Sequence, residues 1–275
     1  GYMPGFLGDL AFGGYDEQVV DLLVQKSVKA IKQAIATQDT VSISYRKTNA
    51  PDHVSNRFIK DGPYDPFVRQ LIFSRKDGKK ALFFTYSAHA TCLSSKFMGL
   101  SGDYPKFLTQ NLENRDYDFA LYAAGTVGSH RPMAKGNTPE KVQEYAANLD
   151  SVIWLRMSNF ASNKLPKVSH SRLDIGLREP HLRISDDLRI RPWVFHQLVG
   201  KMPAYLDITQ IGNVLMISSS GELSGVFYEE WEQLAQSQGL KLIVTVFNGS
   251  YIGYITPDEL YNEHYHEVRE MNWFG

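Results

Sequence analysis

Apolar and polar residues follow two different periods along this chain, one typical of helices and one typical of strands. In residues 16–37 apolar side chains such as Val19, Leu23 and Val28 recur at three- and four-residue spacings, which predicts an amphipathic helix. Residues 40–47 alternate between apolar and polar side chains, as strands do. By these criteria, further helices are predicted at 102–114, 138–159 and 222–239, and further strands at 67–75, 81–89, 117–125, 167–179 and 181–192. Residues 207–221 are rich in strand signals, and residues 240–256 hold a last apolar strand with a polar, glycine-containing turn.

Turn and cap residues support several of these elements. The sequence KDGKK at residues 76–80 separates two apolar strands and predicts a β-hairpin. Thr138 is placed to cap the helix that follows it, and Gly239 is typical of the end of a helix.

Strands that alternate with helices predict an α/β fold, here a layered domain with a mixed, partly antiparallel sheet flanked by helices. We expect residues 1–275 to form a single α/β domain of a catalytic type. In such folds, ligands gather beyond the carboxyl ends of strands. Four segments follow predicted strands directly, namely His89, 125–130, 221–222 and 248–254. These segments are therefore candidates for one shared site.

The composition narrows the classes of protein to which the chain can belong. A net charge of −1 gives no electrostatic case for a nucleic-acid partner or an anionic membrane surface. No apolar run reaches the ~18 residues that a bilayer span needs, so no transmembrane segment is predicted. The single cysteine, Cys92, excludes an internal disulfide and a multi-cysteine zinc site. Because the chain starts without methionine or a secretory signal, we expect an excerpt of a longer protein.

Two of the candidate residues have both a structural and a chemical interpretation. His89, in the stretch SAHAT, is either a hydrogen-bonded histidine at a strand end or a metal ligand, since imidazole nitrogen is a common zinc donor. Glu222 lies three residues after Ser219, which is the spacing of a helix capping box. Alternatively, its carboxylate binds a metal from a loop at a strand end.

The remaining candidates lie in a glycine turn, in an aromatic segment and in a polar loop. In AAGTVGSHRP, backbone amides could bind an anion or form an oxyanion hole, or the turn could be purely structural. Ser129 and His130 are not a catalytic pair by adjacency alone, because nucleophile and base need spatial contact. The C-terminal segment holds Tyr251, Tyr254, Tyr261, Tyr265, His264 and His266, which either pack together or line a site. Arg57 lies in the polar loop.

Several of these segments, in this order, resemble the neutral/alkaline (non-lysosomal) ceramidase family. The motifs are GDLAFGGYDEQVVDLL, SNR, YSAHAT followed by SGDYP, AAG, SSSGELSG and NGSYIGYITPDELY. The resemblance extends over roughly residues 6–274. It implies a zinc-dependent amidase that hydrolyses an N-acyl bond in a lipid such as ceramide, and a protein that acts outside the cytoplasm.

The resemblance also implies the site residues. The zinc ligands would be His89, Glu222 and Tyr254, with Arg57 facing the substrate and Tyr265 as a further active-site tyrosine. The family's first histidine ligand lies in a motif of the type HTHSGPGG, which these 275 residues do not contain.

The glycine turn departs from the family pattern. Family members have a turn of the type GDVSP with a catalytic serine, whereas this chain has GTVGSHRP. Thr126 therefore stands at the aspartate position and Gly128 at the serine position, and Ser129, one place later, is the candidate catalytic serine.

The expected function is thus a zinc-dependent amidohydrolase that cleaves an N-acyl amide bond of a ceramide-like lipid. Zinc would polarise the carbonyl group and activate a water molecule, while Arg57 or the amides of residues 125–129 would stabilise the oxyanion. Two alternatives remain open at this stage. One is a related metal-dependent hydrolase of a non-lipid amide or ester, and the other is a non-catalytic relative that binds a ligand.

Overall fold

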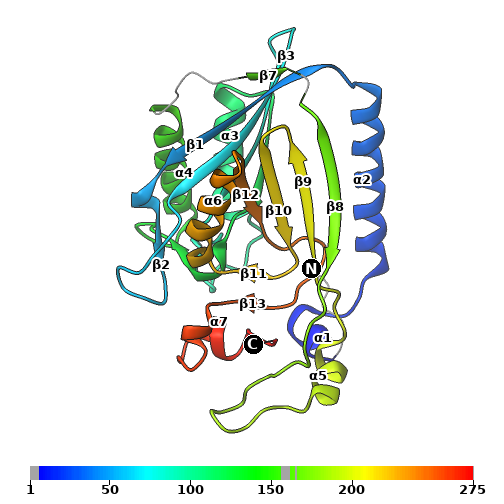
Figure 1. The fold of residues 1–275 in the computed structure, drawn as a ribbon, viewed down its shortest axis with the longest axis vertical. Coiled ribbons are helices and arrows are strands. Elements are labelled where there is room, and N and C mark those ends of the chain that lie inside the picture. Colours follow the sequence, from blue (N-terminus) through cyan, green and yellow to red (C-terminus); the bar gives the residue numbers. More distant parts are fainter. Residues whose placement is uncertain (1–5, 156–161, 165, 275) are drawn as a thin grey trace.

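Two β-sheets face each other at the centre of the molecule, as the computed structural model shows for residues 6–155, 162–164 and 166–274 (Figure 1). The first sheet has the strand order β5 (Phe119–Ala124), β4 (Lys80–Tyr86), β3 (Phe67–Arg75), β1 (Val41–Asn49) and β7 (Ser162–Lys164). The second has the order β12 (Lys241–Thr245), β10 (Val214–Ser219), β9 (Tyr205–Ile211) and β8 (Val168–Asp174).

Both sheets mix parallel and antiparallel pairs, which confirms the predicted α/β class. In the first sheet, β4 pairs with β5 in parallel and with β3 antiparallel. The predicted hairpin is therefore present, with the KDGKK turn between β3 and β4. In the second sheet, β10 pairs in parallel with β12 and antiparallel with β9. The sequence pattern predicted one mixed sheet, whereas the described residues form these two larger sheets and two two-stranded ladders, β11 (Glu222–Leu223) with β13 (Tyr254–Ile255) and β2 (Val54–Asn56) with β6 (His130–Pro132).

Successive residues of β12 show how the layers are joined. Ile243 is fully buried between the sheets with Leu71 of β3 and Val214 of β10. Leu242 and Val244 point to the other face, because side chains alternate along a strand, and pack under α6 (Tyr228–Ser237). The outer face of the first sheet is covered by α3 (Asp103–Arg115) and α4 (Pro139–Leu155).

The helix predicted at 16–37 is present as α2 (Glu17–Ala36), which begins at the cap residue Asp16. None of its residues is buried, and apolar side chains such as Val19 and Leu23 are more than half exposed. The helix lies alongside the second sheet at the edge of the molecule (Figure 1). Among the described residues, no helix is long and apolar enough to cross a membrane.

Two predicted elements differ from the structure. The strand predicted at 181–192 is wrong, because this segment forms only an isolated bridge between Arg183 and Arg189 and leaves its apolar side chains exposed. The helix predicted at 222–239 begins only at Tyr228, because 222–223 form a strand. The last apolar strand predicted within 240–256 is present as β12, and the polar turn expected in that stretch includes Gly249, whose backbone φ is 66°. For the helix predicted at 138–159, positions 156–159 lie outside the described residues.

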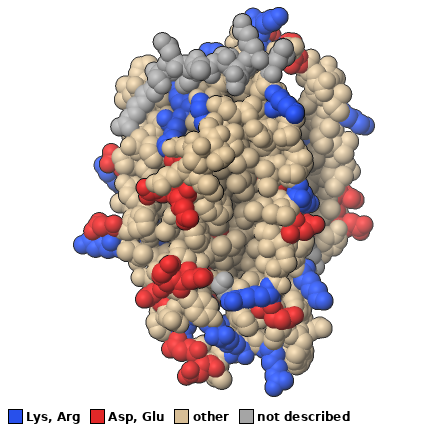
Figure 2. All heavy atoms as spheres, viewed as in Figure 1, with Lys and Arg blue, Asp and Glu red and all other residues tan. Residues whose placement is uncertain are grey.

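The remaining helices and strands of the described chain are short. They are α1 (Phe6–Phe12), η1 (Pro51–His53), β2 (Val54–Asn56), η2 (Val127–Ser129), β6 (His130–Pro132), α5 (Pro192–Val199), β11 (Glu222–Leu223), η3 (Gly225–Phe227), β13 (Tyr254–Ile255), η4 (Asp258–Leu260) and α7 (His266–Arg269). Charged side chains of both signs are interspersed on the face shown in Figure 2, in keeping with a net charge near zero.

Candidate active site

A two-residue parallel ladder between β11 and β13 places two of the predicted ligands next to each other. Glu222 is the register partner of Tyr254, and its backbone N–H donates to the Gly253 carbonyl over 2.9 Å. Register partners in a sheet project their side chains to the same face. The carboxylate of Glu222 and the phenol of Tyr254 therefore face the same space.

His89 reaches this space from the end of β4. Its Nε2 atom lies 3.1 Å from Oε1 of Glu222, and the Glu222 side chain is only 3% exposed. Oε1 is buried and, among the described residues, has no hydrogen-bond partner, since the contact with His89 lacks hydrogen-bond alignment. A buried carboxylate oxygen without a donor is costly unless a cation or another group satisfies it.

Arg57 joins the ladder to the glycine turn. It follows β2, and its Nη2 atom donates to the Gly128 carbonyl and to the Tyr254 hydroxyl, each over 3.2 Å. Its backbone N–H donates to the Ser129 carbonyl over 2.9 Å. The guanidinium of Arg57 therefore supplies positive charge beside the phenol of Tyr254.

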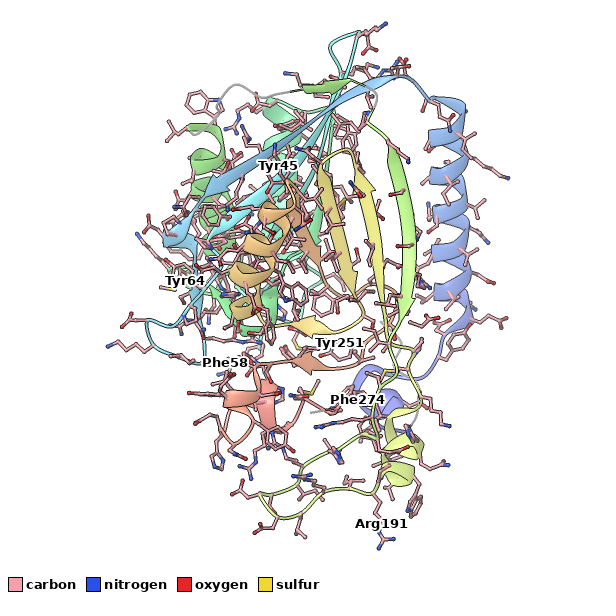
Figure 3. The ribbon with its side chains drawn as sticks, in the orientation of Figure 1. Tyr45, Phe58, Tyr64, Arg191, Tyr251 and Phe274 are labelled. Atoms are coloured by element: carbon pink, nitrogen blue, oxygen red, sulfur yellow. The ribbon has the colours of Figure 1, made fainter. Side chains whose placement is uncertain are left out.

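Tyr251, which the sequence indicated only as one of several tyrosines of the aromatic segment, contacts Glu222 directly. Its hydroxyl donates to the second carboxylate oxygen of Glu222, Oε2, over 3.3 Å. Burial and the charge of Glu222 raise the pKa of Tyr251 well above its usual value, so the hydroxyl keeps its proton as a donor. Figure 3 shows Tyr251 at the level of the β11–β13 ladder. The only sequence signal was its place in the aromatic C-terminal segment.

The same two causes, burial first and then Glu222, raise the pKa of Tyr254, while Arg57 lowers it in part. Without a metal, the Tyr254 phenol is therefore neutral at ordinary pH. A bound cation could deprotonate it, because a metal ion favours the anionic form of its ligands.

An aromatic side chain borders the His89 end of the site. Phe247 follows β12 with a backbone φ of 63°, a left-handed conformation that is uncommon for any residue other than glycine. Its ring centroid lies 6.5 Å from that of His89 and 6.2 Å from that of Tyr251. Such strain is often found at functional sites.

The glycine turn lies directly behind β11. A Cβ atom on Gly128 would come within 2.7 Å of the Glu222 carbonyl oxygen, so glycine allows this close approach. The Ser129 side chain is fully buried, and its hydroxyl accepts a hydrogen bond from the Gly225 amide over 3.0 Å. Within the described residues, no hydrogen bond connects this hydroxyl to His89 or Glu222.

His130, next to Ser129, is held as a neutral ring. Its Nε2 accepts from the Asp65 amide over 3.2 Å, so its Nδ1 carries the proton and donates to the Thr126 carbonyl over 2.9 Å. Burial lowers the pKa of His130, although the Thr126 carbonyl and the Asp65 charge act in the opposite direction. His130 therefore supports the turn rather than facing the ladder.

Tyr265 directly precedes α7. Its ring stacks on that of Phe58, with centroids 5.2 Å apart. In the described part of the chain, no hydrogen bond joins its hydroxyl to Glu222 or Tyr254. His264 and His266 are exposed and do not reach the site.

The capping-box interpretation of Glu222 is wrong. The Ser219 hydroxyl accepts a hydrogen bond from the Gly221 amide over 3.0 Å, and no helix begins at this point. Glu222 instead lies in β11 with its side chain directed at His89. The sequence spacing alone could not separate the two interpretations, because both place a carboxylate three residues after a serine.

The donor set of this space fits a zinc ion. Two ligands bound tetrahedrally at ~2.0–2.1 Å lie roughly 3.3 Å apart, close to the separation of His89 and Glu222. Within the described residues, no group of three or more His, Cys, Asp and Glu side chains is present, so a third protein donor would be the hydroxyl of Tyr254. Three protein donors with one open position are typical of catalytic zinc sites.

Comparison with known proteins shows a fold found in ceramidases. No protein-family model and no curated protein sequence matches the chain. Among solved structures, a neutral ceramidase from Pseudomonas aeruginosa matches 95% of this chain with a TM-score of 0.76 and 14% identity. A ceramidase complexed with C2 matches 98% of it with a TM-score of 0.78 and 13% identity. The chain spans about half of each solved chain, 54% and 55%.

Proposed function

We propose that the protein is a zinc-dependent amidohydrolase that cleaves an N-acyl amide bond, with ceramide-like lipids as its substrate class. The observation that carries this proposal is the 3.1 Å approach of His89 Nε2 to the buried Oε1 of Glu222, which accepts no hydrogen bond from the described residues and lies beside Tyr254. The fold found in ceramidase structures supports the choice of an N-acyl lipid as substrate.

In this proposal His89, Glu222 and Tyr254 hold zinc, which when bound polarises a carbonyl group and activates water at neutral pH. Tyr251 orients the Glu222 carboxylate through its hydroxyl. Arg57, fixed beside Tyr254, faces the substrate carbonyl and stabilises the negative charge that develops on its oxygen. Phe247 and Tyr251 supply the apolar border against which an acyl group packs.

The catalytic roles of Ser129 and Tyr265 stay predictions. Ser129 is buried behind β11, so a role as nucleophile requires its hydroxyl to leave the Gly225 amide. A Ser129→Ala variant that keeps its fold and its hydrolytic rate would remove Ser129 from the mechanism. Localisation outside the cytoplasm likewise stays a prediction.

A second candidate function follows from the same buried serine. Because the altered glycine turn holds the Ser129 hydroxyl against the Gly225 amide, the second candidate is a related metal-dependent hydrolase of a non-lipid amide or ester that has the same metal ligands. A non-catalytic relative that binds a ligand at the same site is the remaining alternative.

The test is hydrolysis of N-acylsphingosines with short and long acyl chains, beside an N-acyl amino acid and a simple ester, with and without a zinc chelator. We expect zinc-dependent release of fatty acid from the N-acylsphingosines, lost in Glu222→Gln. Glu230→Gln, an exposed carboxylate on α6, serves as the matched control and should keep full activity. Hydrolysis of the amino-acid amide or the ester alone would favour the second candidate. Zinc binding without any hydrolysis would favour the ligand-binding relative.

A further inference from the structure

The last residues of the described chain, 266–274, pack directly against the β11–β13 ladder that carries Tyr254. The Tyr254 amide donates to the Met271 carbonyl over 2.9 Å. A Cβ atom on Gly253 would come within 2.3 Å of that same carbonyl oxygen, and the backbone φ of Gly253 is +81°. Only glycine fits both requirements. The segment is therefore in close contact with the ligand strand, with the buried Trp273 ring against Tyr251.

Helix α7, which belongs to this segment, directs one carboxylate at Arg57. The Oε1 atom of Glu267 lies 2.6 Å from Nε of Arg57, and the two side chains are 10% and 20% exposed. The contact is an ion pair without hydrogen-bond alignment at Nε. Burial of a carboxylate costs free energy unless an opposite charge lies beside it. The Arg57 guanidinium provides that charge for Glu267.

The guanidinium of Arg57 is therefore held from two sides. Glu267 contacts its Nε edge, while Nη2 donates to Gly128 and Tyr254. A long arginine side chain has many rotamers. The neutral acceptors at Nη2 restrict these rotamers less than the ion pair at Nε does, because hydrogen bonds between charged groups are stronger. The charge on α7 thus determines where the positive group beside Tyr254 lies.

We propose that Glu267 is a positioning residue, which fixes the Arg57 guanidinium against Tyr254 and so places its charge for the substrate carbonyl. The role of Arg57 toward substrate rests on the proposed function, whereas the ordering of Arg57 by Glu267 does not. No sequence motif indicated Glu267.

The other charged side chains of α7 and its flanks have partners of their own. Arg269 pairs with Asp186 over 2.9 Å, and Glu270 pairs with His266 over 3.5 Å at the exposed surface. Glu270 is thus a matched control for Glu267, since it directly follows α7, bears the same carboxylate and makes an ion pair away from the site.

The first test needs neither metal nor substrate. We would measure the heteronuclear NOE of the Arg57 15Nε–H group in the wild-type protein, in Glu267→Ala, in the isosteric Glu267→Gln and in Glu270→Gln, with the signal assigned by its loss in Arg57→Lys. We expect a rigid side chain in the wild type and in Glu270→Gln, and a mobile one in Glu267→Ala. Should Glu267→Ala fail to fold, Glu267→Gln decides the question. An Arg57 side chain that is equally rigid without the Glu267 charge overturns the proposal.

The second test separates positioning from a merely structural role. With the zinc-loaded protein and an N-acylsphingosine, Glu267→Gln should lower kcat about 10- to 100-fold with little change in KM. A misplaced Arg57 guanidinium weakens the stabilisation of the transition state more than the binding of the substrate. In an Arg57→Ala background the same substitution should have almost no further effect. Additive losses would contradict action through Arg57. Absence of wild-type hydrolysis would refute the proposed function, while the NOE result would still decide the role of Glu267.

Discussion

The Nε2 atom of His89 lies 3.1 Å from Oε1 of Glu222, although one residue follows β4 of the first sheet and the other begins β11 near the end of the second. His89 lies three residues after the end of β4, and Glu222 lies three residues after the end of β10. Oε1 of Glu222 is buried and accepts no hydrogen bond from the described residues, so a metal ion bound here would supply its missing partner.

Removal of the Tyr251 hydroxyl tests how the Glu222 carboxylate is oriented. In Tyr251→Phe the hydrogen bond to Oε2 is lost, so the carboxylate is free to rotate. We expect the zinc affinity to fall about 10-fold or more, as is usual when a partner of a metal ligand is removed. The measurement is competition with a fluorescent zinc chelator.

Tyr122→Phe is the control for this loss. It removes another partly buried tyrosine hydroxyl, one that hydrogen-bonds to Tyr104 of α3 over 3.1 Å. That variant should lose stability but keep its zinc affinity. Equal affinities for Tyr251→Phe and the wild type would show that Tyr251 does not orient Glu222.

The contact of Gly225 with His130 predicts a large effect of one methyl group. A Cβ atom at position 225 would lie 1.7 Å from Cε1 of the His130 ring, which is fully buried and cannot move aside. We expect Gly225→Ala to lower the free energy of unfolding by about 3 kcal/mol or more. Chemical denaturation measures this change.

Gly176 provides the comparison for Gly225. A Cβ atom there meets nothing within 4 Å, and its backbone has no positive φ. Gly176→Ala should therefore change stability by no more than about 1 kcal/mol, and in the stabilising direction. Equal stability of the two alanine variants would contradict the close contact between Gly225 of η3 and the His130 ring.

Burial of His130 predicts a pH dependence of stability. The pKa of this ring is lowered in the folded protein, chiefly by burial, with Arg57 adding to the effect and Thr126 and Asp65 opposing it. Below a pH of about 6.5 the unfolded chain binds a proton at this position while the folded chain does not. The stability contributed by neutral His130 is therefore fully present above that pH and is lost as the pH falls toward the lowered pKa.

His130→Asn removes this titration while keeping an N–H donor for the Thr126 carbonyl. The free energy of unfolding should thus fall less steeply for the variant than for the wild type between about pH 7 and pH 5. Parallel curves would mean that His130 titrates alike in the folded and unfolded states. Titration of Asp65 does not interfere, because its pKa is lowered below the ordinary carboxyl range despite burial, mainly by Arg69.

The sequence predicted those parts of the fold that have a local cause. The β3–β4 hairpin follows from its turn, and Thr138 caps α4 because its hydroxyl oxygen accepts a hydrogen bond from the Lys141 amide. The strand predicted at 181–192 failed because alternation alone does not supply a partner strand, and Ile184 and Leu188 are exposed. The division into two sheets also depends on long-range pairing, which no local pattern contains. Whether 1–275 is a single domain stays a prediction.

The sequence predicted only those residues of the candidate site that belong to a recognisable motif. His89, Glu222, Tyr254 and Arg57 were carried over from a family resemblance, and the structure brings all four together. Glu267 could not be found in this way, because its significance lies in its distance to Arg57 across the fold. The same holds for the buried position of Ser129, which spacing alone left open.

The most direct test of the account is the zinc content of the purified protein, measured by elemental analysis for the wild type, His89→Ala and His170→Ala, an exposed histidine on β8. We expect about one zinc per chain in the wild type and in His170→Ala, and almost none in His89→Ala. No zinc in the wild type, or the same content in His89→Ala, would contradict a metal site between His89 and Glu222.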